Sequence, residues 1–130
     1  MTIVPPKEQV AVLLVSDDLS SLERNRLLLL NAGIRPVFAI ADSRATLAFL
    51  EQHGISVIVL DMSTAMGRGE LLARICKEYP NIQVIVESGS KDVETAVNCM
   101  KSGAVDYMVR PVEPGRMVLA VEQMRVHSPC

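Results

Sequence analysis

The chain has 130 residues, a length typical of a single domain. Its residues are 49% hydrophobic but only 3% aromatic, so the core must be built mainly from aliphatic side chains. The formal net charge of -2 offers no overall field to attract nucleic acid or an acidic membrane. We expect a cytoplasmic domain that binds neither, because no secretory signal opens the sequence and no apolar run reaches the ~18 residues of a membrane span.

Short apolar runs rich in Val and Ile recur along the chain and predict strands. Most of them do not alternate polar with apolar residues, a pattern typical of strands buried on both faces of a parallel sheet. In chain order they cover residues 10–15, 36–40, 56–60, 82–86 and 105–109.

The longer segments between these runs carry the periodicity of helices. Apolar residues recur at i, i+3, i+4 and i+7 in the last two of them, beginning at Val93 and at Met117. Alternation of strand and helix predicts an α/β fold with a parallel sheet and right-handed crossovers. We expect one domain over residues 9–126, with residues 1–8 and 127–130 frayed.

Polar residues follow most of the predicted strands. Asp17 and Asp18 come after the first strand, Asp61 after the third, Ser88 after the fourth and Arg110 after the fifth. The carboxyl ends of parallel strands form the ligand-binding edge of such a sheet. Carboxylates gathered there would repel one another by about 4 kcal/mol per pair at about 4 Å, which calls for a cation. Oxygen ligands with room for water favour Mg²⁺, whereas Asp18 taken alone suits a helix N-cap.

Three stretches carry a resemblance to a known family. They are "VLLVSDD", "VIVLDMSTAMGRGEL" and "VIVESGSKDVETAVNCMKSGAVDYMVRP". In this order they resemble the receiver domain of two-component response regulators, over residues 10 to about 125. The resemblance implies a flavodoxin-like (βα)5 fold, with a five-stranded parallel sheet in the order 2-1-3-4-5.

The resemblance also implies a phosphoacceptor site. Asp61 would take a phosphoryl group from a histidine kinase or a phosphotransfer protein, in a signalling domain that is not itself an enzyme. Asp18 would bind Mg²⁺ directly and Asp17 through water, and the backbone carbonyl of Ser63 would complete the protein ligands of the metal. A homodimer would form through the fourth helix, fifth strand and fifth helix.

The family's switch residues have counterparts as well. Ser88 would bind a phosphoryl oxygen, and Tyr107 would move between outward and inward rotamers. The Arg110-Pro111 bond would be cis, as the family's Lys-Pro bond usually is. A hydrolase of the haloacid dehalogenase type is disfavoured, because it needs a second Asp where this chain has Ser63.

Some residues depart from the family pattern and leave two functions open. Arg110 stands in place of the family's Lys and would either serve as a slower substitute or pair with Asp61. The second case predicts a pseudo-receiver, a protein-interaction domain with impaired phosphorylation. Ser16 and Glu87 stand where apolar residues are usual. The sequence leaves open whether Glu87 faces the site or solvent.

Overall fold

A computed structural model gives the fold and describes residues 11–62 and 68–126. Its strands are β1 (Val12–Val15), β2 (Val37–Ile40), β3 (Val57–Asp61), β4 (Gln83–Ser88) and β5 (Asp106–Val109). All pairings are parallel, and the strand order is β2-β1-β3-β4-β5. The predicted α/β fold and strand order are confirmed.

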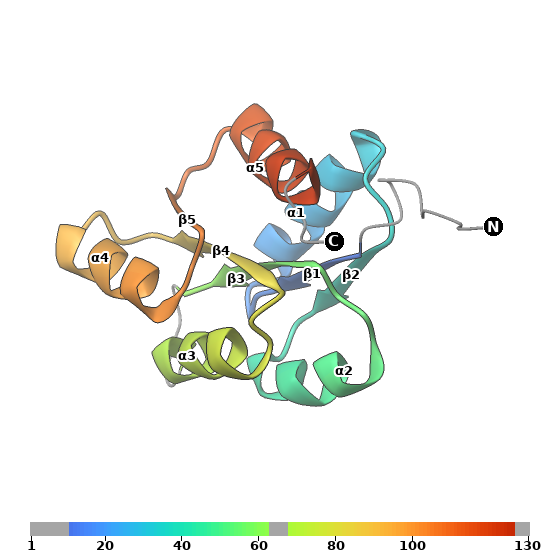
Figure 1. Ribbon diagram of the computed structural model, residues 1–130. Helices are drawn as coiled ribbons and strands as arrows, with labels where there is room; N and C mark the ends of the chain where they lie inside the picture. The colour runs from blue at the N-terminus through green and yellow to red at the C-terminus, as the bar shows by residue number, and fades with distance from the viewer. Residues whose placement is uncertain (1–10, 63–67, 127–130) are drawn as a thin grey trace.

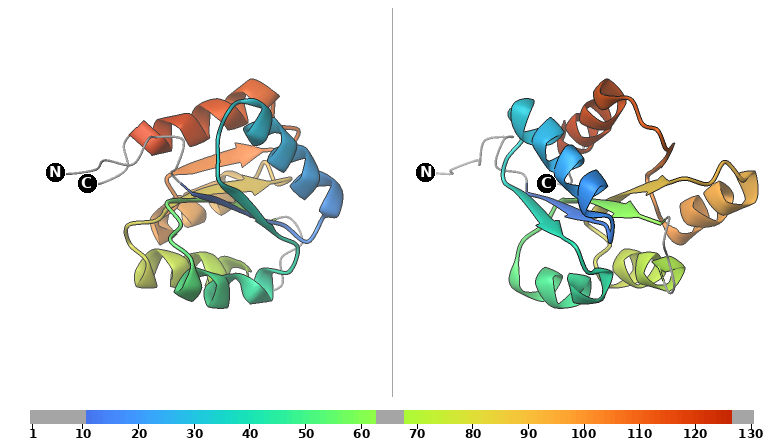
Figure 2. Two further views of the ribbon diagram at one scale, coloured as in Figure 1. Left: turned by 90° about the vertical axis from the view of Figure 1, so that its right-hand side faces the viewer. Right: turned by 180° about the vertical axis from the view of Figure 1, so that it is seen from behind.

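The helices lie on both faces of the sheet, as Figures 1 and 2 show. Their bounds are α1 (Leu19–Asn31), α2 (Thr46–Gln52), α3 (Arg68–Glu78), α4 (Val93–Ser102) and α5 (Pro114–Val126), with a short 3-10 turn η2 (Ser43–Ala45) before α2. Helices α1 and α5 cover one face, and α2, α3 and α4 cover the other.

An aliphatic cluster fills each of the two spaces between sheet and helices. Side chains of a strand point alternately to the two faces, so β1 contributes Leu13 to one cluster and Leu14 to the other. Every residue of β1 and β3 is buried, which explains why these strands read as continuous apolar runs. The thiols of Cys76 and Cys99 are free, and burial raises the pKa of both, in accord with a packing role.

Glycine sets the end of α4. Gly103 has a φ of 119°, a left-handed conformation that an L side chain rarely adopts, and it caps the helix. A Cβ at this position would also lie 2.9 Å from the Cβ of Cys76 on α3. The glycine therefore serves both the helix end and the close approach of α3 to α4.

Candidate functional site at the carboxyl edge of the sheet

A row of polar side chains lines the carboxyl edge of the sheet on the face covered by α1 and α5. The strand register pairs Val15 with Leu60 and Asp61 with Glu87, so Ser16, Asp61 and Glu87 follow one another across β1, β3 and β4. The residue two positions earlier in each strand belongs to the apolar cluster beneath α1 and α5. Because side chains alternate along a strand, these three polar groups are directed to that same face.

Asp61 is buried and held from two sides. Its side chain is 3% exposed. The Oδ2 atom accepts a hydrogen bond of 2.7 Å from the hydroxyl of Ser16, and the Oδ1 atom accepts one from Nη2 of Arg110. A carboxylate removed from water needs such partners, since a buried charge without compensation costs several kcal/mol.

Arg110 comes to this edge from the loop after β5. Its backbone N–H donates to the carbonyl of Ser88 at 2.8 Å, which continues the pairing of β4 and β5 past the last strand residue. The Arg110-Pro111 bond is cis, as expected from the family resemblance. Of the two roles that the sequence left open for Arg110, the structure shows the pairing with Asp61, through the Nη2 contact.

Glu87 adds a second buried carboxylate beside Asp61. Its Oε1 atom accepts a hydrogen bond of 2.9 Å from Nδ2 of Asn25 on α1, and its Oε2 atom lies 3.6 Å from Nε of Arg110. Burial raises the pKa of Glu87, and the charge of Arg110 and the hydrogen bond from Asn25 oppose part of that rise. Glu87 therefore faces the site. Ser16, Asn25, Asp61, Glu87 and Arg110 are called the Asp61 cluster below.

The two acidic residues after β1 have other contacts. Asp18 is the N-cap of α1, where its Oδ1 accepts from the backbone N–H of Ser20 at 3.0 Å and its Oδ2 from the hydroxyl of Ser21 at 3.1 Å. Asp17 accepts from the backbone N–H of Ser43 at 3.4 Å, in the turn before α2. The side chains of Asp17 and Asp18 are exposed, whereas Ser16 is buried beside Asp61.

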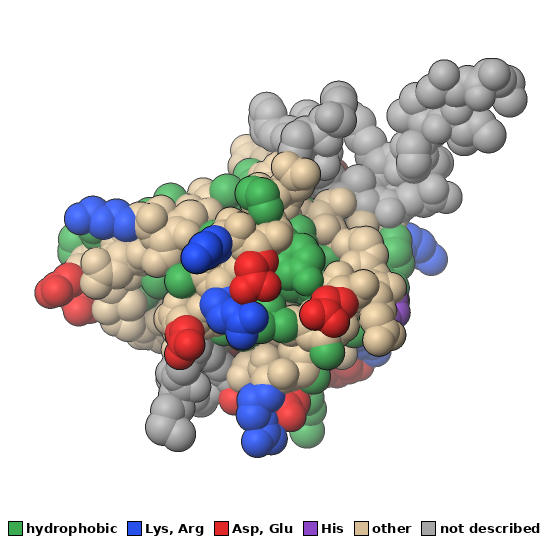
Figure 3. Space-filling model, turned by 60° about the horizontal axis from the view of Figure 1, so that its bottom comes forward, with side chains coloured by type: hydrophobic (Ala, Val, Ile, Leu, Met, Phe, Trp, Pro, Cys, Tyr) green, Lys and Arg blue, Asp and Glu red, His purple; other side chains and the backbone are tan. Residues whose placement is uncertain are grey.

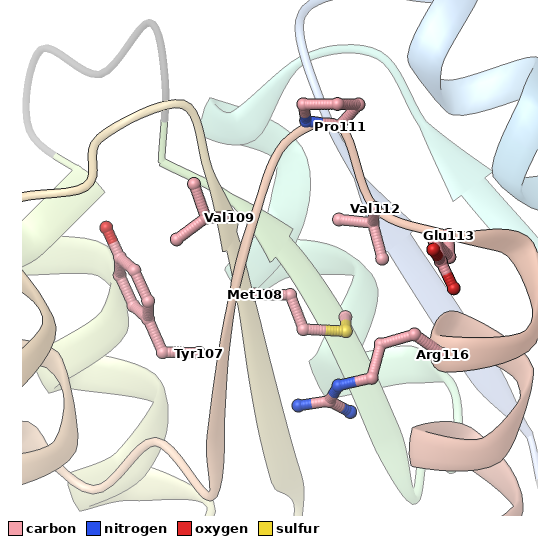
Figure 4. A pocket seen from close by; sticks show the side chains of 7 residues that line it. All are labelled: Tyr107, Met108, Val109, Pro111, Val112, Glu113 and Arg116. Carbon is pink, nitrogen blue, oxygen red and sulfur yellow. The ribbon is translucent and has the colours of Figure 1, made fainter.

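The predicted switch residues both contact the loop between β4 and α4. The hydroxyl of Ser88, 3% exposed, accepts from the backbone N–H of Ser90 at 3.0 Å. The Tyr107 hydroxyl donates to the carbonyl of Ser90 at 2.9 Å. Figure 4 shows Tyr107 and Met108 on opposite sides of β5, with a cavity of about 360 Å³ between β5 and α5 beside Arg116. A rotamer switch at Tyr107 stays a prediction.

The surface charges are mixed in sign. On the face shown in Figure 3, basic and acidic side chains lie interspersed among apolar and neutral groups. On that face, the basic side chains of the described residues do not form the stripe that attracts a phosphate backbone. No helix within residues 11–62 and 68–126 has the length and apolar character of a membrane span.

The comparison with known proteins identifies the family. The model for the response regulator receiver domain matches residues 12–122. The chain belongs to this family. A putative NtrX-like response regulator of Rickettsia felis is 34% identical over 119 residues, which cover 88% of this chain and 25% of the relative. The transcriptional regulatory protein ZraR of Klebsiella oxytoca is 30% identical, over 93% of this chain and 27% of the relative.

Solved receiver domains share the fold. The signal receiver domain of a putative Luxo repressor protein from Vibrio parahaemolyticus has a TM-score of 0.84 at 23% identity and covers 92% of both chains. A CheY-like receiver domain protein from Methanospirillum hungatei also has a TM-score of 0.84, at 24% identity over 92% of this chain and 96% of that one. This receiver domain spans about a quarter of the length of the curated relatives it matches.

Receiver domains in general bind Mg²⁺ for phosphorylation, and the Mg²⁺ site predicted for this receiver stays a prediction. Within residues 11–62 and 68–126, no three His, Cys, Asp or Glu residues lie grouped so as to hold a metal ion. Asp17, Asp18 and Asp61 do not form such a group, and Ser63 lies outside the described residues. The cause is the end of β1: Ser16 takes the place beside Asp61, while Asp18 begins α1.

The sequence alone did not assign Ser16, Asn25 or Glu87 to the Asp61 cluster. Glu87 shares the strand parity of Ile85, which packs beneath α1 and α5, so alternation along β4 was the signal that would have directed it to the site. Ser16 was detectable from the register of β1 against β3. Asn25 lies on α1 among charged and apolar neighbours, and no motif distinguishes it.

Proposed function

We propose that this receiver domain acts in two-component signalling through protein contacts, with Asp61 kept out of phosphoryl transfer by Arg110. The observation that carries the proposal is that both oxygens of the Asp61 carboxylate already accept hydrogen bonds, from Ser16 and Arg110. An attacking carboxylate must point one oxygen at phosphorus, in line with the leaving group. Each hydrogen bond occupies one lone pair of its oxygen and withdraws negative charge from it, so Asp61 becomes a full nucleophile only after it gives up one of these contacts.

Charge supports the same proposal. Transfer of a phosphoryl group to a carboxylate brings two negative groups together, so it depends on positive charge at the site. Here the cation is a guanidinium that lies between Asp61 and Glu87. A guanidinium is a wide planar fork that never loses its proton, whereas the Lys ammonium is a compact point charge on a flexible stem. Arg110 is therefore the harder of the two to displace.

A second candidate is a working phosphoacceptor. What supports it is that Asp61 ends the central strand β3, that Ser88 ends β4 and that Arg110 follows β5 at the same edge. In that function Asp61 takes a phosphoryl group from a histidine kinase or phosphotransfer protein with Mg²⁺, Ser88 binds a phosphoryl oxygen and Tyr107 changes rotamer. We rank it second, because Asp61 must first leave Arg110.

Treatment with a small phosphodonor separates the two functions. The chain is incubated with acetyl phosphate and Mg²⁺, and its intact mass is measured over time. We expect no phosphoryl adduct on the natural chain. Ser16→Asp combined with Arg110→Lys places a further carboxylate beside Asp61 and a compact cation at the edge, and we expect an adduct on that variant. An adduct on the natural chain that Asp61→Asn abolishes would reject the first function in favour of the second.

We further propose that partners dock on the face formed by α4, β5 and α5. Apolar side chains are exposed along one side of α4, where Val93, Val97 and Met100 are 74%, 43% and 45% exposed, and Leu119 on α5 is 54% exposed. Exposed apolar groups at one face are typical of protein contacts. A homodimer through this face would form without any phosphodonor, and Val97→Asp would weaken it.

Light scattering over a concentration series tests this dimer. The matched control is Leu27→Asp, since Leu27 is 46% exposed but lies on α1. We expect the Leu27 variant to associate like the natural chain and the Val97 variant to remain monomeric. A monomeric natural chain at all concentrations would leave the face as a docking site for other proteins only and would reject the homodimer.

A further inference from the structure

We infer that Arg110 is the resident cation of the Asp61 cluster, and that Glu87 and Asn25 are positioning residues that hold it between two buried carboxylates. The inference rests on the proposed function, in which Arg110 keeps Asp61 out of phosphoryl transfer. It goes further by assigning parts to two residues outside the phosphoacceptor pattern, one on β4 and one on α1.

The contacts of the guanidinium carry the inference. Its Nη2 atom donates to Oδ1 of Asp61, and its Nε atom lies 3.6 Å from Oε2 of Glu87. The Nε and Nη2 atoms share one edge of the planar guanidinium, so this edge faces both carboxylates, with a hydrogen bond to Asp61 on β3 and an ion-pair contact with Glu87 on β4. A cation that contacted Asp61 alone would keep the freedom to swing away from the sheet.

Glu87 is itself fixed by a residue of another layer. The amide of Asn25 donates to its Oε1 atom at 2.9 Å, and Asn25 and Glu87 are 6% and 3% exposed. The neighbouring cation on α1, Arg24, instead donates to the backbone carbonyl of Val112 at 3.0 Å. The orientation of Arg110 is therefore tied through Glu87 to the packing of α1 on the sheet.

Repulsion between two buried carboxylates explains why a cation is needed at this place. Asp61 and Glu87 are paired in register on adjacent strands, and both are nearly inaccessible to water. Two carboxylates in such a place repel each other and call for a cation. Arg110 supplies that charge from within the chain, which explains why Asp17 and Asp18 can serve other contacts.

A manganese titration tests the assignment. The 130-residue chain and its Arg110→Gln variant are titrated with Mn²⁺ alone, a cation that carboxylates bind, and bound metal is measured by water-proton relaxation. Removing the resident cation leaves Asp61 and Glu87 uncompensated, so we expect Arg110→Gln to bind Mn²⁺ at least about tenfold more tightly than the natural chain. Adding Glu87→Gln should abolish the gain. No gain, or a gain that survives Glu87→Gln, would overturn the inference.

A second measurement does not depend on the stability of the Arg110 variant. Glu87→Leu replaces a buried charge by an apolar side chain of similar reach and should fold. We expect the Nε–H signal of Arg110 in a ¹H–¹⁵N spectrum to shift and to exchange faster with solvent in Glu87→Leu, and to a smaller degree in Asn25→Ala. An unchanged signal in both variants would contradict the positioning role.

The two proposals fail in different ways. Phosphorylation of the natural chain by acetyl phosphate would reject the proposed function even if Glu87 positions Arg110. An unphosphorylated natural chain with an unshifted Arg110 signal in Glu87→Leu would keep the function and reject the positioning residues.

Discussion

Two Arg–Asp pairs of this receiver domain differ in burial and teach what each can contribute. In the first, Arg110 and Asp61 have side chains 21% and 3% exposed. In the second, Arg116 and Asp106 are 43% and 28% exposed, and Nη2 of Arg116 donates to both carboxylate oxygens at 2.9 and 2.8 Å. The exposed pair shares one donor between two acceptors, and water stabilises both of its charges when the pair opens.

The buried pair has no such alternative. If Arg110 leaves, Asp61 and Glu87 remain as charges in a place that water does not reach. Burial, rather than the number of hydrogen bonds, therefore decides which of the two pairs contributes more to stability. The mutations below test this comparison in order of expected effect.

Arg110→Met should have the largest effect. It removes the only cation in the Asp61 cluster as defined above and leaves two buried carboxylates, so we expect the free energy of unfolding to fall by about 3–5 kcal/mol. Urea denaturation followed by circular dichroism measures the change. A loss below about 1 kcal/mol would mean that the buried pair contributes no more to the free energy of unfolding than the exposed pair, which would contradict the comparison.

Ser16→Ala should come next. It removes the hydroxyl that donates to Oδ2 of Asp61 at 2.7 Å, and a hydrogen bond to a charged group contributes about 1.5–3 kcal/mol. Ser102→Ala is the matched control, because Ser102 is exposed at the end of α4, and its effect should stay within about 0.5 kcal/mol. Equal effects of the two substitutions in urea denaturation would show that Ser16 does not support Asp61.

Glu87→Gln should change the pH dependence of stability. Burial raises the pKa of Glu87 above its ordinary 4.5, so the natural fold is favoured when this carboxyl is protonated and loses stability as pH rises through the folded pKa. Gln keeps an acceptor for Asn25 and cannot ionise. We expect the variant to gain stability over the natural chain as pH rises above about 4.5, measured by urea denaturation at a series of pH values. A difference independent of pH would contradict the raised pKa.

Arg116→Met should have the smallest effect. The pair with Asp106 lies in partial contact with water, and such pairs contribute about 1 kcal/mol or less. High salt should reduce even this contribution, while it leaves the effect of Arg110→Met nearly unchanged. Urea denaturation at low and high salt provides the comparison, and a larger loss for Arg116 than for Arg110 would reverse our account.

The sequence predicts the framework of this site well because hydrophobic patterns report burial directly. Continuous Val and Ile runs identified β1 and β3, and parallel pairing then required their carboxyl ends to share an edge. Asp61 and Arg110 were found at that edge for this reason, and the structure shows them paired. The cis bond at Arg110-Pro111 followed from the family resemblance rather than from any pattern.

The metal donors were harder to predict, because a shift of one residue at the end of a strand changes the role of each side chain. Ser16 follows Val15 directly and lies beside Asp61, while Asp18, two positions later, caps α1. The sequence "SDD" is compatible with either arrangement until the strand's last residue is known. The contact of Asn25 with Glu87 joins a helix to a strand 62 residues away, and no local pattern reports such packing.

A magnesium titration tests the central claim most directly. Backbone amide signals of Ser16, Asp61 and Arg110 are followed by ¹H–¹⁵N NMR while Mg²⁺ is added to the natural chain and to the Ser16→Asp, Arg110→Lys variant. Our account predicts no saturable shift in the natural chain and a saturable shift in the variant. Saturable shifts of all three signals in the natural chain, lost in Asp61→Asn, would show that Arg110 does not replace the metal and would contradict the account.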